Sequence, residues 1–478
     1  MPAWTVPPQP ELPPALARQS RTGAKVLWLS LLIAACSLAV IGIVTYVGWN
    51  IGPVALAVGI TGAILPVPVL AACFLWLDRY QPSPLWIMIT CFLWGAGVAT
   101  SGALAINMFT AGQFTGAGLS ENLVGVLVAP FAEELLKAAF PLLLFAFYRK
   151  AYSGIIDGIV YCGLSATGFA MVENILYLGG HGFASQSENG YAAGAAAATA
   201  IFIVRVPLTG FAHPLFTSMT GIGLGLAARS PHRSVRILAP LIGLLVAMML
   251  HGSWNLIATL AQSDPYLILY GYFAVFMPIF LTMVGAVLWV RSWEGRLAER
   301  VLPVYVAAGW FSPPEVAALG TLGRRLSARS WARRVAGDVG KSAMRGYQVA
   351  ATQLAQVRDG LNRGLYAKPA DLDRAATQER QLLHAIDTYR RAFTGRDPLT
   401  PPARWHGSGY QIRFPDGVVR AVDNPESPVV PVPFAWAAAP AAAWAGAPVS
   451  SAPAGTAQIG SGAEPHGPVG PSGWRGSA

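Results

Sequence analysis

The feature that most constrains this chain is a succession of apolar runs, each about 20 residues or longer, within residues 1–290. A helix of that length crosses the hydrocarbon core of a bilayer. Only 12% of the residues are charged, against roughly 25% in an average soluble domain. The composition therefore excludes an ordinary cytosolic enzyme and predicts an all-α, polytopic membrane helix bundle.

Windows of about 20 residues predict about eight transmembrane helices. The sixth span is interrupted, because we expect an interfacial stretch around Arg205 within 191–206 and a break at Pro207 before the helix that carries His213. The predicted spans are 26–48, 54–77, 85–108, 122–148, 155–178, 199–228, 236–261 and 266–290.

Lys and Arg flank the spans at alternate loops, and this sets the predicted orientation. The positive-inside rule places both termini in the cytoplasm of a multi-pass cell-membrane protein, with loops near 49–53, 109–121, 180–195 and 262–265 outside. Orientation also explains much of the net charge of +10, so we expect no nucleic-acid partner. The basic residues are Arg18, Arg21, Lys25, Arg79, Arg149, Lys150, Arg229, Arg233, Arg236 and Arg291.

The chain changes character after Arg291, where polar residues interrupt the apolar runs. Ser312-Pro313-Pro314-Glu315 predicts a helix start, and 315–335, 340–362 and 371–393 predict amphipathic helices. A hairpin is expected from Gln411 to Arg420, around Phe414-Pro415-Asp416-Gly417. The expected divisions are a cytoplasmic segment 1–25, a transmembrane domain 26–290, a cytoplasmic helical extension 291–397 and a Pro/Ala/Gly-rich, mostly disordered tail 398–478.

Ionisable and amide side chains inside four of the spans form the candidate site. An ionisable residue at membrane depth costs several kcal/mol on most estimates, so it must pair, face water or serve a function. At about 1.5 Å per residue, these side chains lie at compatible depths between mid-membrane and the outer surface. We expect them to meet in one cavity. They are Glu133, Glu134 and Lys137 in the fourth span, Glu173 and Asn174 in the fifth, His213 in the sixth, and His251 and Asn255 in the seventh.

The spacings indicate which groups share a helix face. Glu133 and Lys137 are four residues apart and can neutralise each other, while Glu134 points about 100° away. His251 and Asn255 repeat the four-residue spacing, so the amide can orient the imidazole or share its ligand. Each group alone also has a structural interpretation, as an internal ion pair, a buried hydrogen bond or a clamp between helices. The presence of all these groups at compatible depths favours a functional site over a purely structural one.

Two carboxylates with two imidazoles suit peptide hydrolysis. A glutamate can take the proton from a water, and a histidine or a bound cation can stabilise the oxyanion on the scissile carbonyl. The same residues can bind zinc, which needs three protein ligands and an open position in a catalytic site. The residues leave both a metal-bound water and a carboxylate-activated water open.

These residues, on successive helices, resemble the PrsW family of intramembrane proteases, which is related to the type II prenyl-protein endopeptidases. The resemblance covers roughly 26–290, including Asp78-Arg79-Tyr80-Gln81-Pro82-Ser83-Pro84, where Gln81 and Ser83 replace commoner acidic residues. Its motifs are Glu133-Glu134-x-x-Lys137, Phe169-x-x-x-Glu173-Asn174, His213 and His251-x-x-x-Asn255.

The resemblance implies a bacterial intramembrane peptidase, of metalloprotease-like or glutamic type, that cleaves membrane-anchored proteins such as anti-sigma factors on the extracytoplasmic side. It implies that Glu133 or Glu134 activates water, while His213 and His251 polarise the substrate or, with Glu173, ligate Zn²⁺. Lys137, Asn174 and Asn255 would support them.

Two other functions compete with this hypothesis. Buried Glu, Lys and His side chains also occur along the proton or substrate path of an ion- or proton-coupled transporter. A non-catalytic membrane scaffold would use the cytoplasmic helices to recruit a partner. The absence of internal repeats disfavours a repeat-built transporter. The sequence leaves the substrate, the cleavage position and the oligomeric state open.

Overall fold

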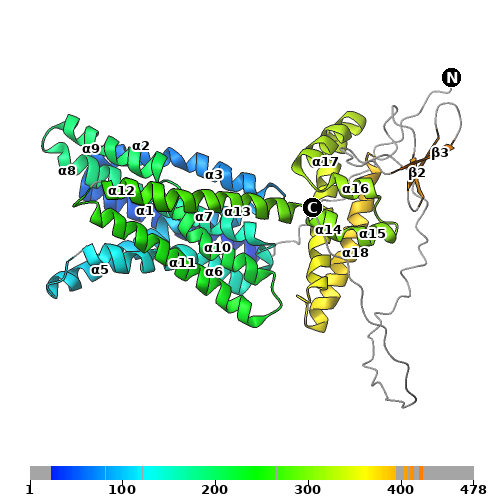
Figure 1. Ribbon diagram of the computed structural model, residues 1–478, viewed down its shortest axis with the longest axis horizontal. Helices are drawn as coiled ribbons and strands as arrows, with labels where there is room; N and C mark the ends of the chain where they lie inside the picture. Colours follow the sequence, from blue (N-terminus) through cyan, green and yellow to red (C-terminus); the bar gives the residue numbers. More distant parts are fainter. Residues whose placement is uncertain are drawn as a thin grey trace, which may run out of the picture. The chain divides into compact units, whose positions relative to one another are not determined.

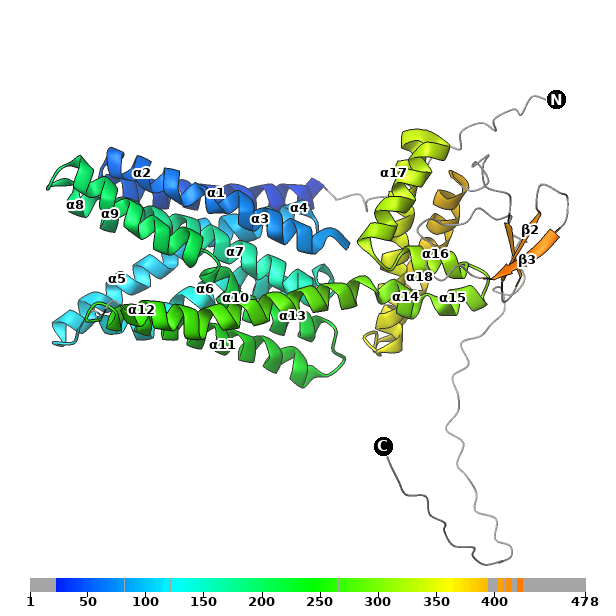
Figure 2. The same ribbon diagram turned by 45° about the horizontal axis from the view of Figure 1, so that its top comes forward.

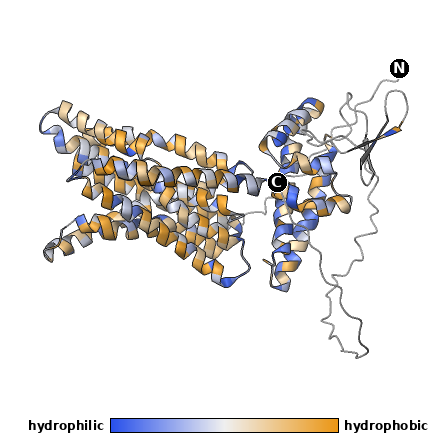
Figure 3. Ribbon diagram, in the orientation of Figure 1, coloured by the Kyte–Doolittle hydropathy of each residue, from blue (hydrophilic) through white to orange (hydrophobic). Residues whose placement is uncertain are grey.

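The computed structural model describes residues 23–80, 82–120, 122–264, 266–393, 403–406, 409–413 and 419–423. Long helices packed side by side form a membrane bundle, and shorter helices form the part that follows it (Figures 1 and 2). Figure 3 shows that apolar residues extend along the bundle helices, whereas α14–α18 are mixed. The expected all-α bundle is confirmed.

The bundle helices correspond closely to the predicted spans. Some predicted spans are two helices joined by a π-helical turn or a proline, as at α2–α3 and α4–α5. The helices are α1 (Gly23–Ile51), α2 (Pro53–Ile64), α3 (Pro66–Leu77), α4 (Leu85–Leu93), α5 (Thr100–Gly116), α6 (Ala129–Tyr148), α7 (Ile155–Ile175), α8 (Ser185–Ser187), α9 (Tyr191–Ile203), α10 (Ala212–Ala228), α11 (Arg233–Leu260), α12 (Tyr266–Tyr270) and α13 (Met277–Gly295).

Seven helical stretches in the described residues are long and apolar enough to cross a membrane. The remaining predicted span, 122–148, contains a π-helical turn, Val124–Val128, followed by α6. Helix α6 packs against α5, α7, α10 and α11 as a member of the bundle. It differs from the seven because Glu133, Glu134 and Lys137 place three charges within it.

Exposed aromatic side chains mark two levels on the bundle. Trp28 and Trp49 on α1 are 71% and 89% exposed, and their separation of 21 residues corresponds to about 31 Å along a helix. Tyr270 and Trp289, on α12 and α13, are similarly exposed and lie about 29 Å apart by the same measure. Tryptophan and tyrosine collect at membrane–water interfaces. The two levels therefore match a hydrocarbon core of about 30 Å.

Helix α7 occupies the centre of the bundle, in contact with α2, α3, α4, α6, α10 and α13. Glycines allow the close approach of its backbone to its neighbours. A Cβ at Gly158 would meet the backbone of Gly221 on α10, and a Cβ at Gly168 would meet the carbonyl of Phe92 on α4. Small residues at helix contacts are a general means of packing in membranes.

The predicted break near Pro207 is confirmed, and Arg205 lies within the same turn. Helices α9 and α10 belong to one membrane-length stretch, Tyr191–Ala228, broken by the π-helical turn Val204–Leu208. Arg205 lies in the middle of that stretch and pairs with Glu173 of α7. The carboxylate offsets the charge of the guanidinium within the bundle.

The segment after the bundle contains α14 (Leu297–Val301), α15 (Pro303–Ala307), α16 (Pro313–Ala318), α17 (Leu322–Asn362) and α18 (Pro369–Arg391). Ser312 and Glu315 form a capping box at α16, which confirms the predicted helix start. The single helix expected over 315–335 is instead α16 followed by the first part of α17. Helix α17 kinks at Ala336 and Gly337, where Gly337 has a φ of 62°, and this matches the predicted boundary between two helices.

The segment has its own core, in which Trp331, Tyr347, Leu354, Ile386 and Phe393 are buried. The predicted hairpin is present as β2 (Gly409–Arg413) and β3 (Val419–Asp423). β1 (Ala403–His406) completes an antiparallel sheet of order β1-β2-β3. The expected turn at 414–417 and the expected disorder of 424–478 lie outside the described residues.

Candidate active site

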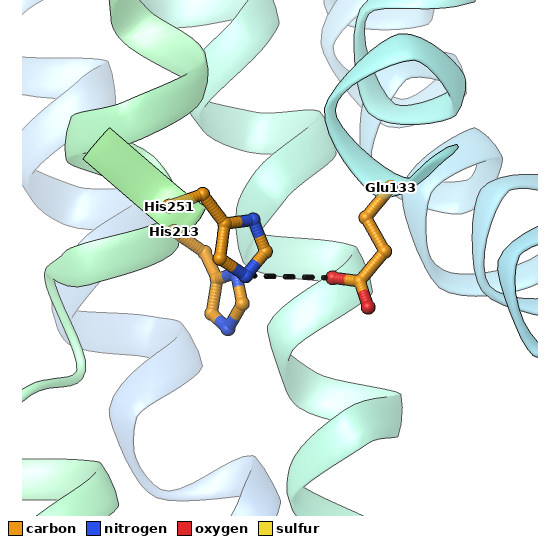
Figure 4. Close-up of side chains that lie close together, drawn as sticks. All are labelled: Glu133, His213 and His251. Atoms are coloured by element: carbon orange, nitrogen blue, oxygen red, sulfur yellow. Dashed lines mark ion pairs between the residues drawn. The ribbon is translucent and has the colours of Figure 1, made fainter. Parts of the chain in front are cut away.

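Helices α6, α10 and α11 bring three potential metal ligands together. Glu133, His213 and His251 each offer a ligand atom, and these atoms lie within 4.8 Å of one another. Figure 4 shows the two imidazoles and the carboxylate facing a common space, with His251 Nε2 at 3.8 Å from Glu133 Oε2. Within the part of the chain that the structure describes, no other group of three His, Cys, Asp or Glu side chains converges in this way.

Lys137 is fully buried beside this group. Its Nζ donates to Glu134 Oε1 at 2.9 Å, to Glu133 Oε2 at 3.3 Å and to His213 Nδ1 at 3.0 Å. The ammonium also lies 4.1 Å from the centre of the Phe169 ring. Lys137 therefore offsets the charge of two neighbouring carboxylates in a site from which water is largely removed.

Glu134 is also fully buried, and both of its oxygens are engaged. Oε1 accepts hydrogen bonds from Lys137 and from His251 Nδ1, the latter at 2.9 Å. Oε2 accepts from Thr217 Oγ1 at 2.7 Å. Because the carboxylate accepts from Nδ1, the network leaves Nε2 of His251 with its lone pair toward Glu133.

Glu173 orients His213, as Glu134 orients His251. Its Oε2 lies 2.7 Å from His213 Nε2 and 2.8 Å from Arg205 Nη2. Arg205 Nε also donates to Asn174 Oδ1 at 2.9 Å, and its guanidinium lies 3.7 Å from the centre of the Tyr177 ring. His213 thus donates from Nε2 and accepts from Lys137 at Nδ1. Hydrogen bonds at both ring nitrogens therefore fix the orientation of the imidazole.

The structure brings the predicted site residues together, but Asn255 does not orient His251. Its Nδ2 donates to the carbonyl of Gly125 at 2.8 Å, and Glu134 holds the ring instead. Sequence reasoning missed Arg205, Thr217 and Asn107, whose Nδ2 lies 3.4 Å from Glu133 Oε1. Arg205 had a usable signal, because it is an arginine within an apolar stretch. Thr217 lies one helical turn after His213.

A cavity of about 700 Å³ reaches this cluster from one end of the bundle. It extends from Glu133 and Glu173 to Asn122 and Gln262, which lie near the ends of their helices. Polar residues continue along its wall between these points: Thr100, Asn107, Tyr177, Arg205, Asn255 and Thr259. The cavity therefore offers a polar path from the end of the bundle to the buried cluster.

The cluster lies well below the mouth of this cavity. Phe147, one residue before the other end of α6, is 86% exposed. Glu133 is 14 residues away, or about 21 Å along the helix. On a span of about 31 Å, this places Glu133 roughly two-thirds of the way across, in the half nearer the cavity mouth.

Comparison with known proteins gives the family. The model for the PrsW family of intramembrane metalloproteases matches residues 83–283. Protease PrsW of Bacillus subtilis (strain 168) is 30% identical over 210 residues, which cover 44% of this chain and 87% of that protein. The chain belongs to the PrsW family. Protease PrsW of Clostridioides difficile (strain 630) is 28% identical over 195 residues, covering 40% of this chain and 76% of that protein.

Membership of the PrsW family confirms the resemblance inferred from the motifs. The protein is an intramembrane protease with multiple membrane helices, so it acts on a protein substrate within a lipid bilayer. No solved structure matches the chain.

The PrsW family is described as metalloproteases, and the donor set of this site fits a metal. A tetrahedral zinc ion with bonds of about 2 Å holds its ligand atoms about 3.3 Å apart, and the three atoms here lie within 4.8 Å. Each imidazole is also bound by a carboxylate at its far nitrogen, the arrangement that fixes the tautomer of metal-binding histidines. Lys137 donates to Nδ1 of His213, so the lysine and a cation compete for that lone pair.

Proposed function

We propose that this PrsW-family protease hydrolyses peptide bonds of membrane-anchored proteins by a metal-dependent mechanism, near the extracytoplasmic half of the bilayer. One observation carries the metal assignment. Glu134 accepts from Nδ1 of His251 and Glu173 from Nε2 of His213, so the remaining nitrogen of each ring is unprotonated. A ring nitrogen without a proton ligates a cation but does not donate a hydrogen bond to an oxyanion.

In this proposal Glu133, His213 and His251 would hold Zn²⁺. When bound, zinc supplies an activated water near neutral pH and polarises the scissile carbonyl. Glu173 and Glu134 orient the two imidazoles. Lys137 offsets the negative charge that the carboxylates bring to the site.

Glu133 has two proposed roles, because one carboxylate oxygen would ligate the cation while the other would take a proton from the attacking water. Its two oxygens face different partners, because Oε2 lies near Lys137 and His251 while Oε1 faces Asn107. Glu133 lines the cavity, whereas both oxygens of Glu134 are occupied by hydrogen bonds. Asn107 Oδ1 is buried without a hydrogen bond among the described residues, so we assign it to an N–H of the substrate backbone.

The side of the membrane follows from charge. Arg149 donates to the carbonyls of Ala227, Ala228 and Ser230, and Arg291 to that of Trp76, so these arginines share one end of the bundle. The cavity opens at the opposite end. The positive-inside rule then places both termini in the cytoplasm of a bacterial cell and the cavity on the extracytoplasmic side. Membrane-anchored anti-sigma factors are substrates of suitable topology.

The test is cleavage of a single-span substrate by the full chain reconstituted in liposomes. Glu133→Gln keeps the shape of the side chain and removes the base, so kcat should fall at least about 10²-fold. His213→Ala and His251→Ala should lose cleavage together with stoichiometric zinc. Glu188→Gln is the matched control, because Glu188 is an exposed acid outside the cavity, and it should cleave normally.

Two outcomes would contradict the proposal. Full activity in protein stripped of metal would leave the metal-free glutamic mechanism, with Glu133 alone activating water. Normal cleavage by Glu133→Gln combined with loss in Glu134→Gln would move the base to Glu134. Protein abundance in the membrane must be equal for all variants, so that loss of cleavage reports chemistry.

A further inference from the structure

A second cavity, of about 160 Å³, lies at the arginine-rich end of the bundle, remote from the peptidase site. The ends of α3, α7, α10 and α13 form one wall, and α14 and α17 form the other. Five arginines line it: Arg229, Arg291, Arg300, Arg325 and Arg363. The peptidase chemistry makes no use of this cavity.

Two of the five arginines share one carboxylate. Arg229 and Arg363 both pair with Asp359 of α17. Arg291, Arg300 and Arg325 form no ion pair with any described residue, and they bond to backbone carbonyls instead. Arg291 donates to Trp76, Arg300 to Trp293, and Arg325 to Leu319 and Tyr80. Three guanidinium groups thus lack a carboxylate within 4.0 Å in the described part of the chain.

Buried donors of this group also lack partners. Arg325 is 2% exposed and Arg291 is 8% exposed. Nη2 of Arg325 and Nε of Arg291 are buried without a hydrogen bond among the described residues. Burial lowers the pKa of the Arg325 guanidinium to about 10. A buried N–H without a partner costs about 1–3 kcal/mol, and more on a charged group, so an acceptor is missing at this place.

Three carboxylates line the same cavity, but each is bound to its own wall. Asp78 accepts from Ser83, Asp157 from Ser153, and Glu294 from the backbone N–H of Ile155. None of them pairs with a lining arginine within 4.0 Å in the described residues. With Asp359 included, five arginines face four carboxylates, so the group keeps one excess positive charge, which favours an anion.

The level of the cavity in the membrane indicates where the anion comes from. Arg291 lies between Trp289 and Trp293 on α13, both of them exposed aromatic residues, and its guanidinium stacks 3.6 Å from the centre of the Trp76 ring. This aromatic level is where lipid headgroups lie. Basic pockets among the ends of membrane helices bind the headgroups of anionic lipids.

We propose that this cavity is a phosphate-binding site, and that the phosphate belongs to the headgroup of an anionic phospholipid. Arg325 and Arg291 donate to the phosphate oxygens from inside, and the more exposed Arg300 closes the site from outside. Guanidinium groups match phosphate geometry and form charge-assisted hydrogen bonds with it. Because residues of both walls contact one phosphate, the lipid joins α14 and α17 to the bundle.

The test measures binding of two probes to the full chain, purified in a nonionic detergent. Dioleoyl phosphatidylglycerol, retained in native mass spectrometry, reports the lipid source, and glycerol 3-phosphate reports a soluble source. Dioleoyl phosphatidylcholine is the reference, since its ammonium adds a positive charge to a positive cavity. The wild type should bind phosphatidylglycerol at least about tenfold more tightly than phosphatidylcholine.

Arg291→Gln and Arg325→Gln should each weaken phosphatidylglycerol binding about tenfold, the effect of losing hydrogen bonds to a charged group. Arg300→Gln keeps the test decisive if the buried variants fail to fold, because Arg300 is exposed. Arg380→Gln removes an exposed arginine of α18 and should change nothing. Tighter binding of glycerol 3-phosphate than of the lipid would support the phosphate site and overturn its lipid source. Unchanged binding of both probes in Arg291→Gln and Arg300→Gln would overturn the site.

Discussion

Adjacent glutamates on α6 have different environments, although nothing in their chemistry distinguishes them. Neighbouring residues on a helix point about 100° apart, so one carboxylate faces the cavity while the other faces the helix contacts. Glu134 is enclosed by Lys137, Thr217 and His251, and Glu133 lines the cavity. The Glu-Glu pair is therefore best explained as one reacting group and one group that positions an imidazole.

Arg205 gives a prediction at this scale, because Glu173 links it to His213. Arg205→Gln removes one side of the Glu173 clamp, so His213 should lose its fixed orientation. Outer contacts of this kind typically change metal affinity or activity 10–100-fold. We expect kcat to fall within that range and the zinc affinity of the purified protein to fall with it.

Arg205→Lys is the matched variant, because it keeps the charge but loses the planar fork that reaches both Glu173 and Asn174. It should recover part of the zinc affinity. A purely structural role for Arg205 would lower protein abundance and leave zinc affinity and kcat per folded molecule unchanged.

The sequence predicted the site's residue types better than their partners. Ionisable residues in apolar spans are unusual, so Glu133, Glu173, His213 and His251 were identifiable without a structure. Helical spacing suggested that Asn255 orients His251, but that prediction considered only contacts within one helix. The actual partner, Glu134, comes from another helix, and contacts between helices depend on packing that a single sequence does not specify.

At the scale of elements, α7 explains how a polar cluster is held firmly inside a membrane. Its glycines bring backbones into direct contact, so α7 packs closely against α10. Glu173 on α7 and His213 on α10 are thereby held at hydrogen-bond distance.

Gly158→Leu tests this packing. A leucine at this position would meet the backbone of Gly221, and overpacking of this kind costs about 1–3 kcal/mol, or more where backbone must move. The folded fraction, measured by size-exclusion chromatography in detergent, should fall. Gly285→Leu is the control, since nothing lies within 4 Å of that position on the exposed face of α13, and it should fold normally.

Long apolar helices were predicted well, because twenty apolar residues have few alternatives to a membrane span. Short elements were predicted poorly. Helices α14 and α15 contain five residues each, too few to show a helical period, and the split between α16 and α17 depends on the packing of the core that surrounds Tyr347. The divisions of the chain at 26, 291 and 398 stay predictions.

At the scale of the whole molecule, charge and chemistry occupy opposite ends of the bundle. The arginines and the proposed phosphate site lie at one end, and the peptidase cavity opens at the other. If the positive end is cytoplasmic, a substrate segment reaches Glu133 from outside the cell. A signal received there could be transmitted by cleavage of a protein anchored in the same membrane.

The orientation is tested by cysteine labelling of intact cells in a Cys73→Ser background, because Cys73 is the exposed member of the four cysteines and the other three are buried. A cysteine at Thr115, near the end of α5 by the cavity mouth, should react with an impermeant thiol reagent. A cysteine at His232 should react only after the cells are permeabilised, since it lies in the loop with Arg229 and Arg233. His232 is preferable to the nearby Ser230, whose side chain is buried and would resist labelling on either side. Labelling of His232→Cys but not Thr115→Cys in intact cells would invert the bundle and place the peptidase cavity on the cytoplasmic side, where it would require a different class of substrate.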